Sequence, residues 1–209
     1  MERREAVKYI SLLLGGAVVG GTGFLTGCKS ETGKPMAWSA EDIAYLDEIA
    51  DTILPQTSTP GAKAAKVGEF MKVMVTDCYE AGDQKAFSEG MVKLNSASDK
   101  KFNKNFMALT PEQRKELLTD VDREAKEYQK KVNDFNGKEN QKERDERDKG
   151  NLNYVKQHMS PHYFTMMKQL TLLGYFTSEV GAKQALRYVP VPGRFEGCIP
   201  YNKGDKAFA

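Results

Sequence analysis

The chain has 209 residues, a formal net charge of +2, 40% hydrophobic residues and 29% charged residues. Acidic and basic side chains nearly balance, so the composition provides no basic surface of the kind that binds nucleic acid. The length is enough for one domain with a substantial core, and the composition is typical of a soluble, mostly helical protein.

The first 28 residues have the pattern of an export signal rather than of a folded element. Arg3 and Arg4 form a charged start, an apolar stretch with five glycines follows over residues 9–24, and Leu-Thr-Gly-Cys ends the pattern at 25–28. The apolar stretch is too short for a transmembrane helix, which needs about 20 predominantly apolar residues. The paired arginines indicate the twin-arginine route, which exports folded proteins. A general secretory signal with an incidental arginine pair is the alternative.

Cys28 ends a sequence that resembles a bacterial lipobox, in which the cysteine is acylated and becomes the new N-terminus. We therefore expect three parts, namely a cleaved signal peptide over 1–27, a lipid-anchored tether over 28–38 and a single helical domain over 39–209. The mature protein would lie on the periplasmic side of the cell envelope, attached to a membrane through its lipid.

The mature chain has the periodicity of about six helices, which predicts an all-α domain. Ser39 and Asp42 form a near capping box, so the first helix is expected over 40–54, ending before Pro55. A loop rich in turn-forming residues follows over 55–61.

The next three helices are predicted from apolar residues at helical spacing. The second is expected over 64–80, with Cys78 on its apolar stripe, and the Gly-Asp pair at 82–83 is expected to interrupt the chain. The third carries the apolar residues Phe87, Met91, Leu94 and Phe102. Thr110 begins the fourth, with proline at the first helical position, and this helix is expected to end near Phe135.

Residues 137–151 are almost wholly charged or polar, with mixed signs, and are interpreted as a solvated insertion or a frayed helix end. A fresh helix is expected from the Ser-Pro pair at 160–161 to Gly174, and a short helix over about 178–187. The inner face of the fresh helix is expected to consist of Phe164, Met167, Leu170 and Leu173. From Tyr188 onward, repeated prolines predict an extended tail.

If Cys28 is the lipid anchor, two cysteines remain, Cys78 and Cys198. In an oxidising compartment we expect these two thiols to form a disulfide. The bond would close a loop of about 120 residues, which stabilises a fold by about 3–5 kcal/mol in the chain-entropy model. The alternative is two unrelated buried thiols.

The sequence offers no group of residues that would make the chain an enzyme by itself. His158 and His162 are the only histidines, and a spacing of four residues can place two metal ligands on one helical face. Pro161 interrupts the helix between them, so we interpret both as surface or partly buried polar residues. The haem motif Cys-x-x-Cys-His, the dinucleotide motif Gly-x-Gly-x-x-Gly and the nucleophile elbow Gly-x-Ser-x-Gly are all missing from the mature chain. We therefore expect no catalytic residue, no cofactor-binding residue and no metal ligand.

Two blocks of the sequence are distinctive. The first is Leu-x-x-Ile-Ala-Asp-Thr-Ile-Leu-Pro at 46–55, followed by Thr-Pro-Gly-Ala at 59–62. The second is Leu-Thr-Leu-Leu-Gly-Tyr-Phe-Thr-Ser-Glu-Val-Gly at 170–181, followed by Tyr-x-Pro-Val-Pro-Gly-x-Phe-x-Gly-Cys at 188–198. In this order, and with both cysteines, the blocks resemble the gluconate 2-dehydrogenase subunit 3 family over residues 40–201.

The resemblance implies a small, non-catalytic subunit of a membrane-associated dehydrogenase of sugars or sugar acids. The partner would be a large FAD-containing flavoprotein of the glucose-methanol-choline oxidoreductase type, and a cytochrome subunit with haem c can take the electrons. Such small subunits typically carry the twin-arginine signal that the flavin-loaded partner lacks. This chain would then hold no cofactor of its own and would bring the folded complex across the membrane.

The resemblance also suggests a partner-binding surface over residues 175–181 and 189–201. The residues expected to form it are Tyr175, Phe176, Ser178, Glu179, Pro190, Pro192, Phe195 and Tyr201. Aromatic side chains and an extended, proline-rich segment can bury a large apolar area against a partner. The alternative is that the same residues pack within this chain, with Cys198 bonded to Cys78.

Two other functions compete with that of an accessory and export subunit. One is a free-standing envelope lipoprotein that binds a small ligand or acts as a scaffold. The other is an enzyme that uses His162 together with nearby carboxylates.

Overall fold

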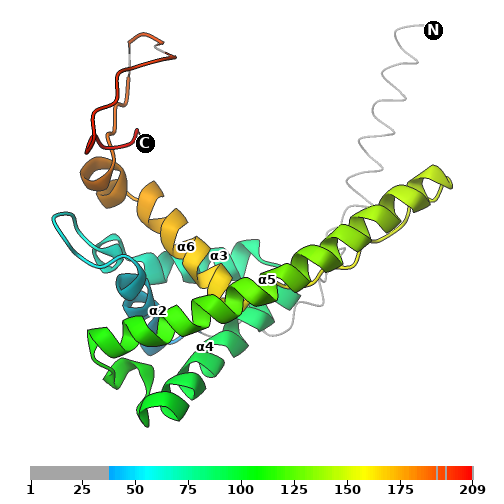
Figure 1. The fold of residues 1–209 in the computed structure, drawn as a ribbon, viewed down its shortest axis with the longest axis horizontal. Coiled ribbons are helices and arrows are strands. Elements are labelled where there is room, and N and C mark those ends of the chain that lie inside the picture. The colour runs from blue at the N-terminus through cyan, green and yellow to red at the C-terminus, as the bar shows by residue number, and fades with distance from the viewer. Residues whose placement is uncertain (1–37, 192, 196, 209) are drawn as a thin grey trace, which may run out of the picture. The chain divides into compact units, whose positions relative to one another are not determined.

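The computed structural model describes residues 38–191, 193–195 and 197–208. This part of the chain is all-α, with five α-helices, two 3₁₀ turns and one π-helical turn (Figure 1). Within it, the only β-type pairing is an isolated bridge between Arg187 and Phe208. The all-α fold that the periodicity predicts is therefore confirmed. The predicted signal and lipidation residues, Arg3, Arg4 and Cys28, lie outside the described residues.

Helix α2 (Ala40–Ile53) begins at the predicted cap. The Ser39 side chain accepts a hydrogen bond from the backbone N–H of Asp42 at 3.1 Å, and the Asp42 carboxylate accepts from the backbone N–H of Ser39 at 3.0 Å. This reciprocal pair satisfies two N–H groups that have no partner inside the helix. The helix ends one residue before its predicted end, and its buried face includes Leu46 and Ile49.

The predicted second helix is divided in the structure into a 3₁₀ turn, η1 (Ala62–Ala65), and helix α3 (Val67–Cys78). Lys66 lies between them with a left-handed φ of 53°. The Asp47 carboxylate on α2 accepts a hydrogen bond from the backbone N–H of Gly68 at 2.7 Å, so α2 caps the start of α3. Cys78 is exposed rather than on the apolar stripe, because it is the last residue of the helix.

Helix α4 (Ala81–Phe102) begins earlier than predicted and includes the Gly-Asp pair at 82–83. The interruption lies instead at Tyr79 and Glu80, whose backbones are extended. The pair is tolerated because it falls in the first turn, where glycine breaks few helical hydrogen bonds and an acidic side chain such as Asp83 is favourable. A 3₁₀ turn, η2 (Phe106–Ala108), follows α4.

Helix α5 (Pro111–Asp148) has the predicted capping box at Thr110 but continues through the charged segment. The expectation of a helix end near Phe135, followed by a solvated insertion or a frayed end, is therefore wrong. Charged side chains three and four residues apart form ion pairs along this helix, among them Lys142 with Glu139 and Arg147 with Glu143. Such pairs each stabilise a helix slightly and explain why mixed charges favour helix here.

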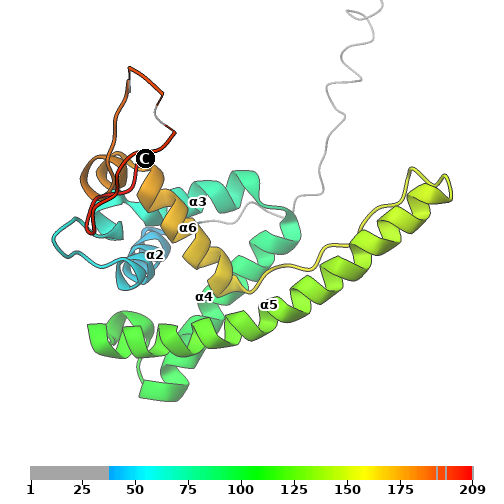
Figure 2. The same cartoon turned by 45° about the horizontal axis from the view of Figure 1, so that its top comes forward.

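The second half of α5 and the chain that returns from it, residues 136–160, form an arm that projects from the helical bundle (Figure 2). Glu139 of α5 joins the helix to the returning segment. Its carboxylate accepts hydrogen bonds from the Tyr154 hydroxyl at 2.9 Å and the Gln157 N–H at 3.2 Å. Hydrogen bonds from Lys142 and then Tyr154 lower the pKa of Glu139, so its charged form is the one that holds the arm.

Helix α6 (Tyr163–Thr177) runs through the middle of the bundle and packs against each of the other α-helices (Figure 1). Three of the four predicted inner residues, Phe164, Met167 and Leu170, are buried, whereas Leu173 is 46% exposed. Gly174 does not end the helix as expected. A π-helical turn, η3 (Gly181–Ala185), and the tail follow.

The crossing of α4 and α6 requires a residue without a side chain at Gly90. A Cβ atom placed there would lie 2.2 Å from the Cβ of Tyr163, far inside van der Waals contact. Tyr163 therefore sits directly on the backbone of α4. The buried core around this crossing includes Leu46, Ile49, Met71, Phe87, Leu94, Phe106, Met166 and Met167.

Replacing Gly90 with alanine is expected to lower the free energy of unfolding by about 1–3 kcal/mol, because the new methyl group must push α6 away. The matched control is Gly137→Ala in the middle of α5, where a Cβ atom meets nothing within 4 Å. Alanine should raise stability there by about 0.5–1 kcal/mol through its better helix propensity. Urea unfolding followed by circular dichroism measures the free energy of unfolding of both variants. If the two substitutions change this free energy in the same direction, the packing described at Gly90 is contradicted.

Candidate functional site

The two distinctive sequence blocks meet at one end of the domain. The Tyr175 hydroxyl at the end of α6 donates a hydrogen bond to the backbone carbonyl of Pro60 at 2.6 Å, across 115 residues of sequence. The loop over 55–61 is closed by a hydrogen bond from the N–H of Ala62 to the carbonyl of Leu54 at 2.9 Å. The loop lies beside the C-terminal end of α6 in both ribbon views (Figures 1 and 2).

Ser178 and Gly181 turn the chain sharply at the end of α6. The Ser178 hydroxyl donates to the carbonyl of Tyr175 at 2.6 Å and accepts from the N–H of Gly181 at 3.0 Å. A Cβ atom at Gly181 would lie 1.9 Å from the Tyr175 carbonyl oxygen, so only glycine fits. These residues of the second block thus set the direction in which the chain leaves α6.

An ion-pair network holds the first block in place. The Glu48 carboxylate on α2 binds Lys63 of η1 at 2.8 Å and the guanidinium of Arg114 on α5. Burial acts to raise the pKa of Glu48, but the hydrogen bonds and charges of Lys63 and Arg114 outweigh it and lower the pKa. Ion pairs therefore join α2 to η1 and α5 on either side of the loop.

The residues predicted to bind a partner differ in their exposure and in their contacts within the chain. Tyr175 is 4% exposed and uses its hydroxyl within the chain, and Ser178 belongs to the turn. Glu179 is exposed and pairs with Lys183 at 2.7 Å. Phe176 is 38% exposed, with its ring edge-on to Tyr175 at a centroid distance of 5.1 Å. Of these four, Phe176 is the apolar side chain that solvent reaches.

The tail carries about half of the exposed large apolar side chains of the described residues. Pro190 and Tyr201 are exposed, Phe195 is 95% exposed, and Pro192 lies outside the described residues. The tail returns to η3, because the N–H of Arg187 donates to the carbonyl of Ala207 at 2.7 Å.

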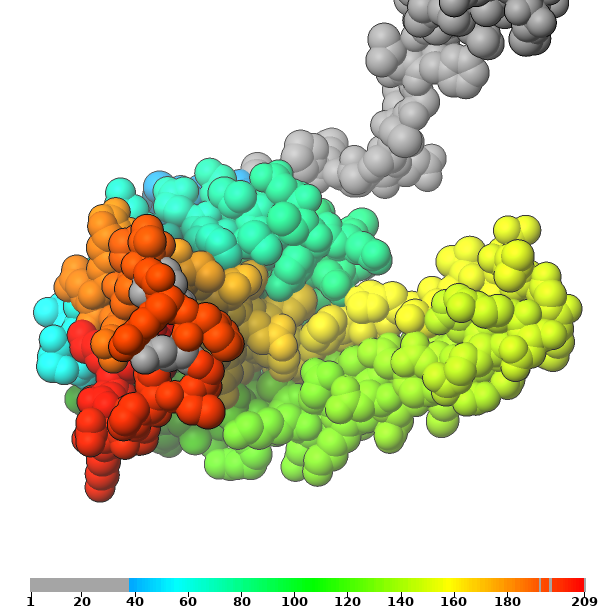
Figure 3. Space-filling view, turned by 90° about the horizontal axis from the view of Figure 1, so that it is seen from above, coloured from blue at the N-terminus to red at the C-terminus, as the bar shows by residue number. Residues whose placement is uncertain are grey.

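We call the following set the apolar end: Leu172, Leu173 and Phe176 of α6, with Tyr188, Val189, Val191, Phe195, Ile199, Tyr201 and Phe208 of the tail. Figure 3 shows the orange and red tail gathered at one side of the domain, with the arm of α5 at the other. Leu172 and Leu173 were not predicted to be exposed. A clue exists in the sequence, because 170–176 is mostly apolar around the whole helix, and such a helix is either fully buried or covered by something else.

The two cysteines of the domain, Cys78 and Cys198, are free and exposed in this structure. The structure therefore does not contain the expected disulfide, and the bond stays a prediction.

The two histidines occupy different environments. His158 is exposed and binds the Asp83 carboxylate at 3.0 Å. His162 is 8% exposed and caps α6, with its Nδ1 accepting from the N–H of Phe164 at 3.3 Å. Burial lowers the pKa of His162 despite the nearby charge of Glu124. The two rings do not share a helical face, because α6 begins only at Tyr163.

Across residues 38–191, 193–195 and 197–208 there is no cluster of three or more histidine, cysteine, aspartate or glutamate side chains that could hold a metal ion. Within the same ranges, none of the helices combines the length and the apolar character needed to cross a membrane.

A model of the family described as gluconate 2-dehydrogenase subunit 3 matches residues 40–193 of the 209-residue chain. Comparisons with curated proteins and with solved structures found no match. The matched range includes all the α-helices described above, the loop of the first block and the turn of the second. Because the match covers more than half of the chain, the protein belongs to the gluconate 2-dehydrogenase subunit 3 family, whose members are accessory subunits of gluconate 2-dehydrogenase complexes.

Proposed function

We propose that this chain is a non-catalytic subunit that binds a large FAD-containing dehydrogenase of the glucose-methanol-choline type, acting on a sugar or sugar acid. The apolar end is the proposed contact surface. The observation that supports the proposal is that exposed apolar side chains are concentrated in the last turns of α6 and in the tail that follows it, next to the contact between the two family blocks. Exposed apolar patches of this kind mark protein–protein contacts in soluble proteins.

The apolar end is large enough for a stable interface. Four of its side chains are aromatic residues of the tail, namely Tyr188, Phe195, Tyr201 and Phe208. A whole aromatic side chain buries about 150–250 Å², and these four are 50%, 95%, 74% and 51% exposed, so together they can supply about 400–700 Å². A typical stable interface buries about 800 Å² on each partner. Together with Leu172, Leu173 and Phe176, the tail therefore suffices for a specific complex.

The roles of the predicted block residues divide accordingly. Tyr175, Ser178 and Gly181 position the surface from within the chain, while Phe176 and the tail contact the partner. Glu179, which already pairs with Lys183, lies at the rim, where polar contacts contribute specificity more than affinity.

The proposed export role rests on the sequence of the first 28 residues. FAD binds its protein in the cytoplasm, so the flavoprotein must be folded before it crosses the membrane. One twin-arginine signal, at Arg3 and Arg4, is then enough for a complex that already holds together. Acylated Cys28 would attach the exported complex to the membrane on the periplasmic side, where a cytochrome with haem c can accept electrons.

The expected disulfide between Cys78 and Cys198 is compatible with the length of the tail. Twelve residues separate Leu186 from Cys198 and can span about 40 Å when extended, whereas α3 with its 12 residues is about 18 Å long. The length of the tail alone therefore does not exclude the bond. Such a bond would fix the direction of the tail before the partner binds.

Replacing Phe176 or Phe195 with aspartate is expected to weaken the complex about 30-fold or more, because a central aromatic contact is commonly worth 2 kcal/mol or more. The measurement is co-purification and affinity of the flavoprotein with each variant. Val155→Asp on the arm is the matched control, since Val155 is 84% exposed but lies away from the apolar end. If Val155→Asp and Phe195→Asp lower the affinity for the flavoprotein equally, the proposed contact surface is contradicted.

The double variant Arg3→Lys, Arg4→Lys is expected to leave both this protein and its flavoprotein partner in the cytoplasm. Cell fractionation with an assay for FAD in each fraction measures this. Normal export of the double variant would rule out the twin-arginine route and favour a general secretory signal. Cys28→Ser is the parallel test of the lipid anchor, because the complex should then be exported but released from the membrane.

Mass spectrometry of the exported protein is expected to show a species lighter by two hydrogen atoms than the fully reduced chain, because Cys78 and Cys198 are oxidised to a disulfide. Reductant should restore the heavier mass. Two free thiols in protein taken directly from the periplasm would show that the bond does not form.

A further inference from the structure

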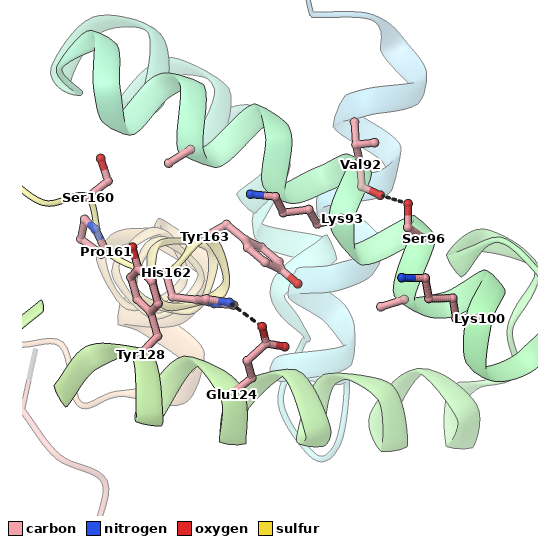
Figure 4. A pocket seen from close by; sticks show the side chains of 12 residues that line it. Val92, Lys93, Ser96, Lys100, Glu124, Tyr128, Ser160, Pro161, His162 and Tyr163 are labelled. Carbon is pink, nitrogen blue, oxygen red and sulfur yellow. Dashed lines mark hydrogen bonds and ion pairs between the residues drawn. The ribbon is translucent and has the colours of Figure 1, made fainter. Parts of the chain in front are cut away.

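A pocket lies between α4, α5 and the start of α6, on a part of the domain that the apolar end does not include (Figure 4). Its volume is about 490 Å³, within the range of small-molecule sites. Its charged and tyrosine side chains come from three helices: Lys93 and Lys100 from α4, Glu124 and Tyr128 from α5, and Tyr163 from α6. Ser96, Ser160 and His162 also line it.

The hydroxyl of Tyr163 is an unpaired hydrogen-bonding group at the wall of the pocket, where solvent reaches it. The side chain is 8% exposed and its ring is seated on Gly90, yet the hydroxyl points into the pocket and has no hydrogen-bond partner among the described residues (Figure 4). Burial, and then the charge of Glu124, raise the pKa of Tyr163 to about 12. The hydroxyl therefore stays protonated at neutral pH and is available to donate to a bound acceptor.

His162 adds a second donor to the same wall. Its Nδ1 accepts from the N–H of Phe164, so the neutral ring carries its proton on Nε2. Nε2 lies 3.8 Å from the Glu124 carboxylate, and Figure 4 shows the two side chains directed toward each other across the pocket. The Glu124 side chain is 72% exposed, and its carboxylate is an acceptor at the mouth of the pocket for a ligand hydroxyl.

The charges that line the pocket favour an anion. Lys93 and Lys100 are seven residues apart and so lie about two turns apart on one face of α4. Lys93 forms an ion pair with Glu89 at 3.5 Å, whereas Lys100 has no ion pair among the described residues. The N-terminus of α6 adds a partial positive charge. Against these, Glu124 is the one carboxylate among the lining residues.

We propose that this pocket binds a small organic anion, whose carboxylate or phosphate group is held by Lys100 and the hydroxyl of Tyr163, while Lys93, two turns away on α4, adds positive charge to the pocket. Glu124 accepts a hydrogen bond from a hydroxyl group of the same ligand. The apolar lining residues Ala86, Val92, Ala97 and Pro161 contact its carbon atoms. This combination of apolar walls with a few convergent polar groups suits an organic molecule better than a bare ion.

Isothermal titration calorimetry of the full-length protein tests the site with L-malate, glycerol 3-phosphate and uncharged glycerol. We expect one or both anions to bind with a stoichiometry of one, and glycerol not to bind. Binding of malate alone assigns the site to carboxylates, and binding of glycerol 3-phosphate alone assigns it to phosphates. If neither anion binds at millimolar concentration, the proposal is overturned.

Two variants show whether binding occurs in this pocket. Tyr163→Phe keeps the ring on Gly90 and removes only the hydroxyl, so the fold is retained while the affinity should fall about tenfold. Lys100→Ala should have a similar or larger effect. Lys85→Ala, also on α4 but outside the pocket, should bind as the unmodified protein does. Unchanged affinity in Tyr163→Phe, or equal losses for the Lys85 and Lys100 variants, would overturn the proposal.

Discussion

The hydrogen bond from the Tyr175 hydroxyl to the Pro60 carbonyl is the contact on which the arrangement of the candidate surface depends. The Tyr175 side chain is 4% exposed and Pro60 is partly buried, and a polar group left unpaired in a buried place costs about 1–3 kcal/mol. The bond fixes the loop of the first block to the end of α6, and the turn at Ser178 and Gly181 then directs the tail away from it. Residues that are far apart in the sequence thereby define one end of the domain.

Helix α6 explains why that end is apolar. Over its first three turns the helix directs apolar side chains into the bundle, where Met166, Met167 and Leu170 are buried, whereas Gln169 on the opposite side is exposed. Its last turns have the same apolar character but emerge from the bundle, so Leu172, Leu173 and Phe176 reach solvent. An apolar helix end that its own chain covers only in part is available for a second covering surface. In the proposed complex the partner and the tail together provide it.

The sequence predicts the helices well where the pattern is local. Capping boxes at Ser39 and Thr110 mark two helix starts correctly, because the groups that form each box lie within one turn. The predicted helix boundaries are wrong where residues distant in the sequence determine them. Asp47 moves the start of α3, and Glu139 with its partners from the returning chain keeps α5 helical through the charged segment. Likewise, sequence alone assigns Tyr175 to the partner surface, since its bond to Pro60 is visible only in the fold.

Hydrogen exchange of the apolar end, measured with and without the flavoprotein, tests the central claim most directly. If this chain binds its partner through α6 and the tail, amides over residues 172–181 and 186–201 should exchange more slowly in the complex, while the arm over 136–160 stays unchanged. Protection limited to the arm or to α4, with unchanged exchange over 172–201, would contradict the account.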